Sequence, residues 1–403
     1  MRHPLKSGGA IDQGQLLLPL LDALETCGGA AAPGDVYPVM AESLGVRDPG
    51  REIDGGKGGQ VNAFARDVRW ARQRAKLEGL IDSPSPGMWR LTGKGNKALR
   101  EAQPGVVVTV FTSESGVALW ARCEDALRYV DDASVQLIFT SPPYALQRKK
   151  AYGNKDSRSY VDWMTDLVAA QREKLTADGS LVLNLGDCWE KGRPSLDLYA
   201  ERLLIRLVDD LGLNLAQRFE WENPSKMPAP AEWVTIRRER VKPSLERLYW
   251  LSPADHPYAD NRTVLKPYSA SMSRRLASGG DTRGERPSGH VVGDGAFATD
   301  NGGAIPGNLL SIPNTDSGSA YLRYCREEGL PVHPARFPVA LPRFFIKLLS
   351  RPGDVVADFM AGSGTLAAAA EPMGRKWIIG EMMLEYLQGL PGRLAGSTFG
   401  ELR

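Results

Sequence analysis

The stretch TSPPY, Thr140 to Tyr144, places two prolines between a serine and a tyrosine, directly after the apolar run VQLIF. Each proline has a fixed φ angle and lacks an N–H group, so the chain is stiff here and offers no competing backbone donor. The tyrosine adds an aromatic face. Two interpretations remain open for the stretch taken alone, a tight surface turn and a rigid cradle for a flat ligand.

A second candidate site is DFMAGSGT, Asp358 to Thr365, at a predicted junction of strand, loop and helix. Gly362 and Gly364 let the backbone approach a ligand closely, and the N–H groups that begin the next helix favour anionic or polar atoms. The spacing is not GxGxxG, and no lysine follows as in a nucleoside-triphosphate loop. Glu381 ends the next predicted strand, KWIIGE, where a carboxylate can accept hydrogen bonds from a ribose diol. These residues predict a ligand that contains a nucleoside.

Taken together, the two motifs resemble those of the DNA amino-methyltransferases. DFMAGSGT followed by RKWIIGEMMLEYL is similar to the S-adenosylmethionine motifs of that family, and TSPPY is similar to its catalytic motif. The catalytic motif comes first in this chain, which is the order of the permuted β class. HPARFP, CEDAL, GSLVLNLGD and WENPSKMPAP resemble further motifs of the family, and the resemblance extends from Ala118 to Leu387.

The resemblance implies transfer of a methyl group from S-adenosylmethionine to the exocyclic amine of a base flipped out of double-stranded DNA. The amine must pyramidalise to attack, and acceptors aimed at both N–H bonds stabilise that transition state. By analogy with the family, the Ser141 hydroxyl and the Pro142 carbonyl are these acceptors, Pro142 and Pro143 keep the loop rigid, and Tyr144 stacks on the base. The reaction requires neither a metal nor a covalent enzyme nucleophile. The resemblance implies cofactor contacts from Asp125, Thr140, Phe337, Pro338, Asp358, Phe359, Ala361, Gly362, Ser363, Gly364, Thr365 and Glu381.

The residue before the prolines bears on the choice of base. The family uses Asp or Asn there mostly for adenine N6 and Ser mostly for cytosine N4, so Ser141 favours cytosine. Adenine N6 stays open as the alternative, because aspartate and serine can both accept a hydrogen bond from an amine. We expect a site-specific cytosine-N4 DNA methyltransferase of a restriction–modification system. A cognate restriction endonuclease and a second copy of the chain are the candidate protein partners.

Two other functions are compatible with parts of the pattern. The chain could be a winged-helix regulator of DNA whose methyltransferase half has lost its activity, although the intact TSPPY and GSGT motifs argue against decay. Methylation of RNA or of a protein glutamine also uses a PPY motif. That option fits poorly with two segments that are predicted to bind DNA.

The elements that must position these residues alternate between strands and helices, which predicts an α/β sheet covered on both faces. The resemblance specifies a Rossmann-like methyltransferase fold with a mixed, mostly parallel seven-stranded sheet. We expect the catalytic domain in residues 115–255 and 333–403, preceded by a linker from Glu101 to Glu114.

Residues 1–105 predict three helices followed by a short strand, Met88 to Leu91, in the order of a winged-helix domain. The segment GLI…GMWRLTGKG resembles the N-terminal winged-helix domain of some bacterial restriction-system proteins. On the third helix, Phe64, Val68, Ala71 and Ala75 share an apolar face. Its candidate DNA contacts are Arg66, Arg69 and Arg72, for which a solvated helix face is the alternative.

Residues 256–332 lack apolar periodicity and are rich in Ser, Gly and Arg. Such a composition is typical of disordered segments, but long loops inside compact domains usually carry function. We therefore predict a target-recognition insertion with candidate DNA contacts at Arg274, Arg275 and Arg283.

The composition is that of an ordinary globular protein. The 403 residues are 42% hydrophobic and 24% charged, with a net charge of +2 that does not discriminate between partners. The four cysteines show no CxxC spacing and the four histidines are dispersed, which predicts reduced thiols, a cytoplasmic location and no structural zinc. No signal peptide or membrane-spanning stretch is expected.

Overall fold

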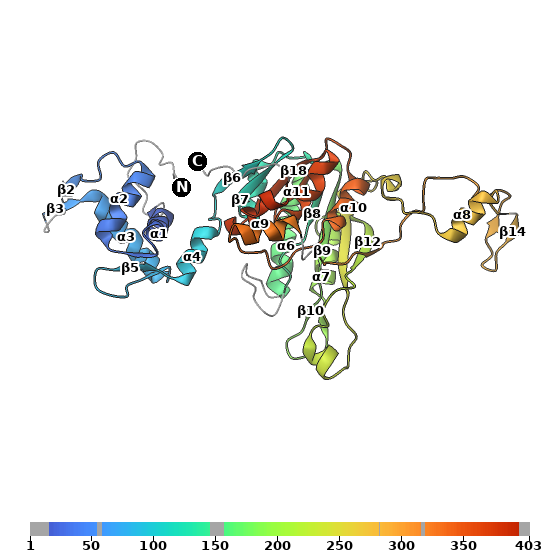
Figure 1. Cartoon of the computed structure of the whole chain (residues 1–403), viewed down its shortest axis with the longest axis horizontal. Helices are drawn as coiled ribbons and strands as arrows, with labels where there is room; N and C mark the ends of the chain where they lie inside the picture. The colour runs from blue at the N-terminus through green and yellow to red at the C-terminus, as the bar shows by residue number, and fades with distance from the viewer. Residues whose placement is uncertain (1–15, 55–58, 146–156, 282, 316–318, 395–403) are drawn as a thin grey trace. The chain divides into compact units, whose positions relative to one another are not determined.

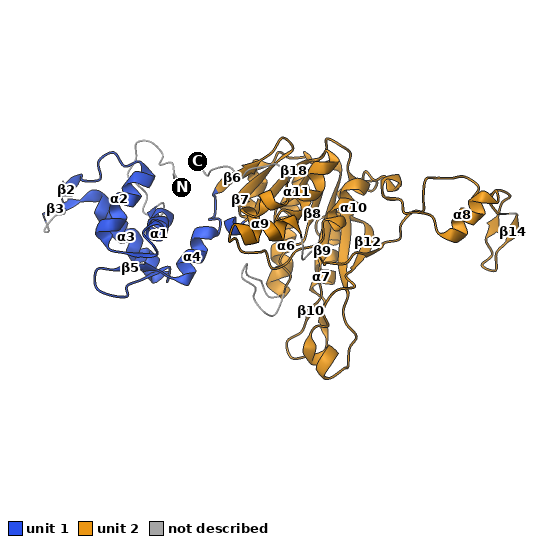
Figure 2. Ribbon diagram, in the orientation of Figure 1, with its two compact units in different colours: residues 1–106, 382–385, 400–403 blue, residues 107–381, 386–399 orange. Residues whose placement is uncertain are grey.

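The computed structural model describes residues 16–54, 59–145, 157–281, 283–315 and 319–394. The chain divides into two compact units (Figure 2). Of the described residues, those from Leu16 to Val106 and the short stretch Met382–Glu385 form the first unit, and those in 107–381 and 386–394 form the second. Each unit buries an apolar core of its own. No helix in these described ranges is long and apolar enough to cross a membrane.

The first unit contains three helices followed by a small antiparallel hairpin, as the sequence predicted. The face of α3 that carries Phe64, Val68, Ala71 and Ala75 is buried, which confirms the predicted amphipathic helix. The Asn62 side chain caps α3 by accepting a hydrogen bond from the N–H of Ala65 (2.7 Å). A three-stranded sheet has the order β1-β5-β4, and β2 pairs with β3. The elements are α1 (Leu17–Thr26), β1 (Ala30–Ala31), α2 (Pro33–Leu44), β2 (Glu52–Asp54), β3 (Gln60–Asn62), α3 (Ala63–Leu77), β4 (Ile81–Asp82), β5 (Trp89–Leu91) and α4 (Gly93–Arg100).

The second unit is built on a sheet in which nine strands are described, in the order β16-β12-β13-β9-β8-β17-β18-β7-β6. Strands β7, β18, β17, β8 and β9 are parallel neighbours. Three pairs of strands are antiparallel: β6 with β7, β9 with β13, and β13 with β12. The strands are β6 (Val107–Thr112), β7 (Gly116–Ala121), β8 (Val135–Thr140), β9 (Leu175–Leu185), β12 (Asn214–Glu222), β13 (Leu245–Ser252), β16 (Leu309–Ser311), β17 (Val355–Asp358) and β18 (Lys376–Glu381).

This sheet confirms the mixed, mostly parallel Rossmann-like fold but corrects its strand number and two boundaries. Nine strands are seen in the described residues where seven were predicted. Strand β6 lies in the predicted linker, where the β-branched run VVTVF pairs with β7 instead of spanning freely. Strand β16 lies in the predicted insertion but pairs with β12, so part of residues 256–332 belongs to the sheet.

Helices cover both faces of the sheet (Figure 1). Ile138 belongs to the apolar cluster that includes α6 and α7, whereas the ring of its neighbour Phe139 lies 5.6 Å from that of Phe345 in α10. Successive side chains of a strand point to opposite faces, so α6 and α10 lie on opposite sides. The helices of this unit are α5 (Cys123–Ala126), α6 (Ser157–Lys174), α7 (Tyr199–Asp209), α8 (Ala270–Ala277), α9 (Ala320–Glu327), α10 (Ala340–Leu349), α11 (Thr365–Ala370) and α12 (Leu384–Leu387).

Smaller elements complete the second unit. The pair β10 (Cys188–Trp189) and β11 (Leu196–Asp197) follows β9, and the pair β14 (Gly284–Glu285) and β15 (Val291–Val292) follows α8. Helix α8 has no buried residue, in keeping with the absence of apolar periodicity in that segment. Single turns of 3₁₀ helix occur at Leu127–Tyr129, Asn261–Val264, Glu371–Met373 and Leu390–Gly392, and a π-helical turn occurs at Glu232–Ile236.

Candidate active site

The topology brings the two sequence motifs to one edge of the sheet. Strands β7, β18, β17 and β8 are parallel neighbours, so their carboxyl ends lie side by side. Thr140 ends β8, Asp358 ends β17, Glu381 ends β18, and Asp125 follows the end of β7. Ligands of open α/β sheets bind at this edge. The catalytic loop and the glycine-rich loop are therefore adjacent although more than two hundred residues separate them in the chain.

The glycine-rich loop is held closely by its surroundings. Gly362 and Gly364 have positive φ angles of 53° and 74°, a region that side chains disfavour. The Gly362 N–H donates to Glu381 Oε2 (2.8 Å), and a Cβ at Gly362 would lie 2.9 Å from His333 Nε2. The Ser363 hydroxyl accepts from Arg393 Nη2 (2.7 Å). His333 of HPARFP thus lies directly against the loop.

Two buried polar atoms next to this loop lack a hydrogen-bond partner among the described residues, Thr140 Oγ1 and Asp358 Oδ2. The other Asp358 oxygen accepts from the N–H of Met360 (3.0 Å). Burial raises the pKa of Asp358 to about 7, although the N–H of Met360 and the Thr140 hydroxyl, which lies close enough to interact with the carboxylate, both lower it; the nearby Glu381 carboxylate adds to the rise. Unsatisfied buried polar groups are rare in native proteins and need an explanation. A ligand with hydrogen-bond donors, bound at the ends of β8 and β17, would satisfy them.

The remaining predicted cofactor residues lie at or near the same edge. Phe359, Ala361 and Thr365 are buried, so they shape the loop from beneath. The ring of Phe337 packs edge-on against Phe139 with 5.3 Å between centroids, and Pro338 precedes α10. Asp125 is buried and pairs with Arg128 (3.0 Å).

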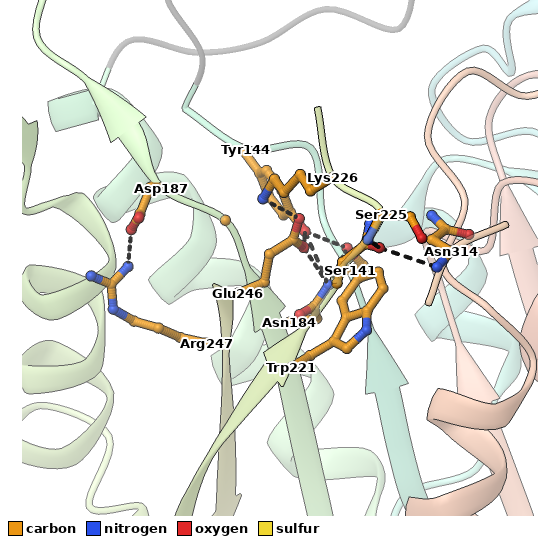
Figure 3. Close-up of polar contacts among 12 residues, drawn as sticks. Ser141, Tyr144, Asn184, Asp187, Trp221, Ser225, Lys226, Glu246, Arg247 and Asn314 are labelled. Atoms are coloured by element: carbon orange, nitrogen blue, oxygen red, sulfur yellow. Dashed lines mark hydrogen bonds and ion pairs between the residues drawn. The ribbon is translucent and has the colours of Figure 1, made fainter. Parts of the chain in front are cut away.

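The catalytic loop forms a hydrogen-bonded network with neighbouring strands (Figure 3). The Tyr144 hydroxyl donates to Glu246 Oε2 (2.7 Å) and lies 3.1 Å from Ser141 Oγ. Asn184 Nδ2 lies 3.3 Å from Ser141 Oγ, 3.0 Å from the Tyr144 hydroxyl and 3.1 Å from Glu246 Oε2. Lys226 Nζ donates to Glu246 Oε1 (3.0 Å). The loop is therefore anchored through its side chains to β9 and β13.

This network fixes the direction of the Ser141 hydroxyl. Because Tyr144 gives its proton to the Glu246 carboxylate, the contact between Ser141 and Tyr144 must be donated by Ser141. Burial, followed by the charge of Glu246, raises the pKa of Tyr144 well above its usual value, so the phenol remains a donor at neutral pH. Ser141 Oγ can then offer a lone pair to an incoming donor.

The Tyr144 ring lies directly on the backbone of Gly186. A Cβ at Gly186 would be 2.5 Å from Tyr144 Cε2. The Gly186 carbonyl accepts from the Tyr199 hydroxyl (2.5 Å), and the next residue of the catalytic loop, Ala145, accepts from Cys188 Sγ (2.7 Å). Cys188 therefore supports the catalytic loop. Pro142 is buried, whereas Ser141 and Pro143 are half-buried.

Sequence reasoning missed three members of this network, Asn184, Lys226 and Glu246. Asn184 and Lys226 lie within GSLVLNLGD and WENPSKMPAP, which resemble family motifs but gave no sign of a role at Ser141. Glu246 is the second residue of β13, which runs antiparallel to β9 so that Arg247 pairs with Leu185. Only that strand register brings Glu246 beside the catalytic loop.

The arginines predicted to bind DNA have different surroundings. On α3, Arg66 and Arg69 are exposed, whereas the Arg72 guanidinium bonds Ser83 and lies 5.8 Å from the centroid of the Trp89 ring. Arg72 therefore supports the hairpin of its own unit, and this contact weakens its assignment to DNA.

The three arginines of the predicted insertion make none of the hydrogen bonds of the catalytic network described above. Arg274 is exposed, and Arg275 pairs with Asp281 (2.9 Å) and lies over Phe297. Arg283 is exposed, and its backbone N–H donates to Asp294. Within the described residues, no group of three or more His, Cys, Asp or Glu side chains is arranged to hold a metal ion.

Comparison with known proteins gives two family matches. Residues 135–390 match the family described as DNA methylase, and residues 14–101 match the Mrr N-terminal domain. The chain is 42% identical over 293 residues to the Type II methyltransferase M.PvuII of Proteus hauseri, covering 72% of this chain and 87% of that protein. It is 25% identical over 288 residues to the DNA adenine methyltransferase YhdJ of Escherichia coli (strain K12), covering 70% of this chain and 84% of that protein. Among solved structures, the PvuII DNA methyltransferase (cytosine-N4-specific) aligns with a TM-score of 0.59 at 36% identity, covering 73% of this chain and 91% of that one.

Proposed function

This chain belongs to the DNA methylase family, and from that premise we propose that it methylates the N4 amine of a cytosine flipped out of double-stranded DNA. The observation that carries the proposal is the Ser141 hydroxyl, whose network leaves a lone pair available beside the glycine-rich loop. The relative whose solved structure is titled cytosine-N4-specific supports the choice of base. Adenine N6 is the second candidate, because the adenine methyltransferase YhdJ is also similar to this chain.

S-adenosylmethionine is the cofactor, and it supplies an electrophilic methyl group on a sulfonium sulfur when bound. Its site is the edge formed by the ends of β7, β18, β17 and β8. We assign the nucleoside end to Glu381 and Asp125 and the donor groups of the cofactor to Asp358 and Thr140. The buried atom Asp358 Oδ2 supports this fit, because it has no hydrogen bond within 3.5 Å to any residue that the structure describes, although the Thr140 hydroxyl lies close by.

In this proposal, Ser141 Oγ and the Pro142 carbonyl each accept one hydrogen of the target amine. Accepting both hydrogens favours the pyramidal nitrogen, whose lone pair then faces the cofactor. Tyr144 and Glu246 act as positioning residues, because they orient the Ser141 hydroxyl. Tyr144 also remains the candidate for stacking on the base.

Several wider assignments are part of the same proposal. We place the protein in the cytoplasm as the modification enzyme of a restriction–modification system, with a cognate endonuclease acting on the same site. The match of residues 14–101 to the Mrr N-terminal domain supports this context. Residues 1–105 serve as a winged-helix DNA-binding domain, and the part of residues 256–332 outside the sheet serves in target recognition. The active form is a monomer or a homodimer.

The proposal is tested by expressing the chain in a host that lacks cytosine-N4 methylation and analysing nucleosides of the host DNA by mass spectrometry. We expect N4-methylcytosine with the wild-type chain and none with Ser141→Ala. N6-methyladenine in its place would overturn the base assignment and keep the chemistry. If neither modified base is found, and no tritium is transferred from methyl-labelled S-adenosylmethionine to any DNA tested, the proposed activity is overturned.

A further inference from the structure

The loop of residues 223–244, which connects β12 to β13, extends from the edge of the sheet that carries the catalytic loop. In Figure 1 it is the yellow-green segment that extends beyond β10, away from the sheet. β12 ends at Glu222 and β13 begins at Leu245, so both ends of the loop lie beside the network around Ser141.

The 223–244 loop presents large apolar side chains to solvent. Met227, Ile236 and Val241 are 77%, 69% and 88% exposed, and the turn Glu232–Ile236 has no buried residue. The loop is nevertheless folded, because the N–H groups of Glu239 and Arg240 both donate to the Trp233 carbonyl. Several exposed apolar side chains on one ordered loop mark a contact surface for another molecule.

The charge of the loop indicates which molecule. It contains five basic and two acidic residues, so it complements a polyanion. Arg238 is exposed with a positive φ of 57° and has no hydrogen bond or ion pair to any residue that the structure describes. A positive φ is costly for arginine, and such strain is typical of functional positions.

The loop is also tied to the catalytic residues. Lys226 Nζ donates to Glu246 Oε1 (3.0 Å), and the other oxygen of that carboxylate accepts from Tyr144. Figure 3 shows Lys226 within this network, and the next residue in the sequence is the exposed Met227. The 223–244 loop therefore has a direct hydrogen bond to the network that orients Ser141.

We propose that the 223–244 loop binds the DNA duplex beside the target base, with Arg238 at a phosphate and the apolar side chains against the stack that the flipped base leaves. Apolar wedges that enter a base stack offset the cost of unstacking in other DNA-distorting proteins. The inference rests on the proposed function, because it assumes that the substrate is a base extruded from duplex DNA.

The test of the apolar surface uses Met227→Ala and Ile236→Ala in the full chain, with Ile205→Ala as the matched control. Ile205 lies on α7, outside the loop, and is 58% exposed. The substrate is a duplex carrying the site found by modification sequencing of host DNA. We expect single-turnover methylation by Met227→Ala to fall roughly tenfold or more, with Ile236→Ala also slower and Ile205→Ala unchanged. Pairing the target cytosine with a mismatched base should restore the rate of both loop variants, since a mismatched base costs less to unstack.

Arg238→Ala tests the phosphate contact, with Arg172→Ala, an exposed residue in the last turn of α6, as control. We expect the slope of log affinity against log salt to decrease in magnitude by about one for Arg238→Ala and to stay constant for Arg172→Ala. If the wild-type chain is active and the loop variants behave like their controls on both duplexes, the inference is wrong and the proposed function stands. If the wild-type chain methylates no DNA, the proposed function itself fails.

Discussion

At the scale of single residues, the site depends on which group donates and which accepts in each buried hydrogen bond. Ser141 is useful as an acceptor only if its own proton is directed elsewhere, and the bond from Tyr144 to Glu246 directs it. One carboxylate thus determines the orientation of two hydroxyl groups. The same carboxylate accepts a hydrogen bond from Lys226, so a change at Glu246 affects the 223–244 loop as well as Ser141.

Replacement of Glu246 tests this order of donors. In Glu246→Gln the side-chain amide can donate to the Tyr144 hydroxyl, which allows the chain of bonds to reverse and point a proton at the substrate amine. We expect kcat to fall roughly 10- to 100-fold, about 1.4–2.7 kcal/mol, with little change in cofactor affinity. Rapid-quench kinetics and a cofactor-binding titration measure the two quantities. A fall in cofactor affinity with kcat unchanged would remove Glu246 from the catalytic network.

The raised pKa of Asp358 predicts a pH dependence of cofactor binding. Burial raises this pKa to about 7, and a ligand that donates to the carboxylate must lower it again. Binding therefore releases a proton wherever Asp358 is protonated in the free protein, so affinity should rise with pH up to about 7 and level off above. Asp358→Asn should bind weakly and without this rise.

Titration with S-adenosylhomocysteine between roughly pH 5.5 and 8.5 measures the effect, because calorimetry reports both affinity and proton release. Subtracting the Asp358→Asn profile of log affinity against pH from the wild-type profile leaves the pH dependence that is due to Asp358. Identical profiles for the two proteins would show that this carboxylate does not titrate on binding.

At the scale of elements, the strands bring distant residues together. Helix α3, the strands β17 and β18, and the adjacency of the two motifs were predictable, because local apolar periodicity and glycine-rich turns define them. The roles of Glu246, Lys226 and Asn184 were not predictable. The contact between Asn184 and Glu246 depends on the strand pairing of β9 with β13, and Lys226 reaches Glu246 from the loop between β12 and β13. The edge strand β16 has three residues, too few to show a period of two.

The contact between Gly186 and Tyr144 gives a prediction for the turn after β9. A Cβ at Gly186 would lie 2.5 Å from Tyr144 Cε2, so Gly186→Ala must displace the ring. We expect roughly a 100-fold loss of kcat, because a shift on the order of 1 Å in a catalytic group can cost that much. Gly307→Ala, where a Cβ meets no atom within 4 Å, is the control. Near-native activity of Gly186→Ala, with folding confirmed by circular dichroism, would mean that the position of the ring is unimportant.

At the scale of the whole molecule, the chain joins a methyltransferase unit to a unit that matches the Mrr N-terminal domain. The family and the fold class were predictable because two motifs in permuted order define them. The extent of the domains was less predictable, because β6 and β16 join the sheet from segments that looked irregular.

The N-terminal unit is expected to add DNA affinity without affecting the cofactor site. Combined replacement of the exposed residues Arg66 and Arg69 by alanine should weaken binding to any duplex and decrease the salt slope by up to about two. Fluorescence anisotropy at several salt concentrations measures it, and cofactor titration serves as control. An unchanged slope would reject DNA contact by this face of α3.

The central claim is that Ser141 serves the N4 amine of cytosine. Mass spectrometry of nucleosides from DNA treated with purified protein and S-adenosylmethionine carrying a labelled methyl group tests it most directly. The account predicts labelled N4-methylcytosine with the wild-type chain and its loss in Ser141→Ala. Labelled N6-methyladenine, or undiminished methylcytosine in Ser141→Ala, would contradict it.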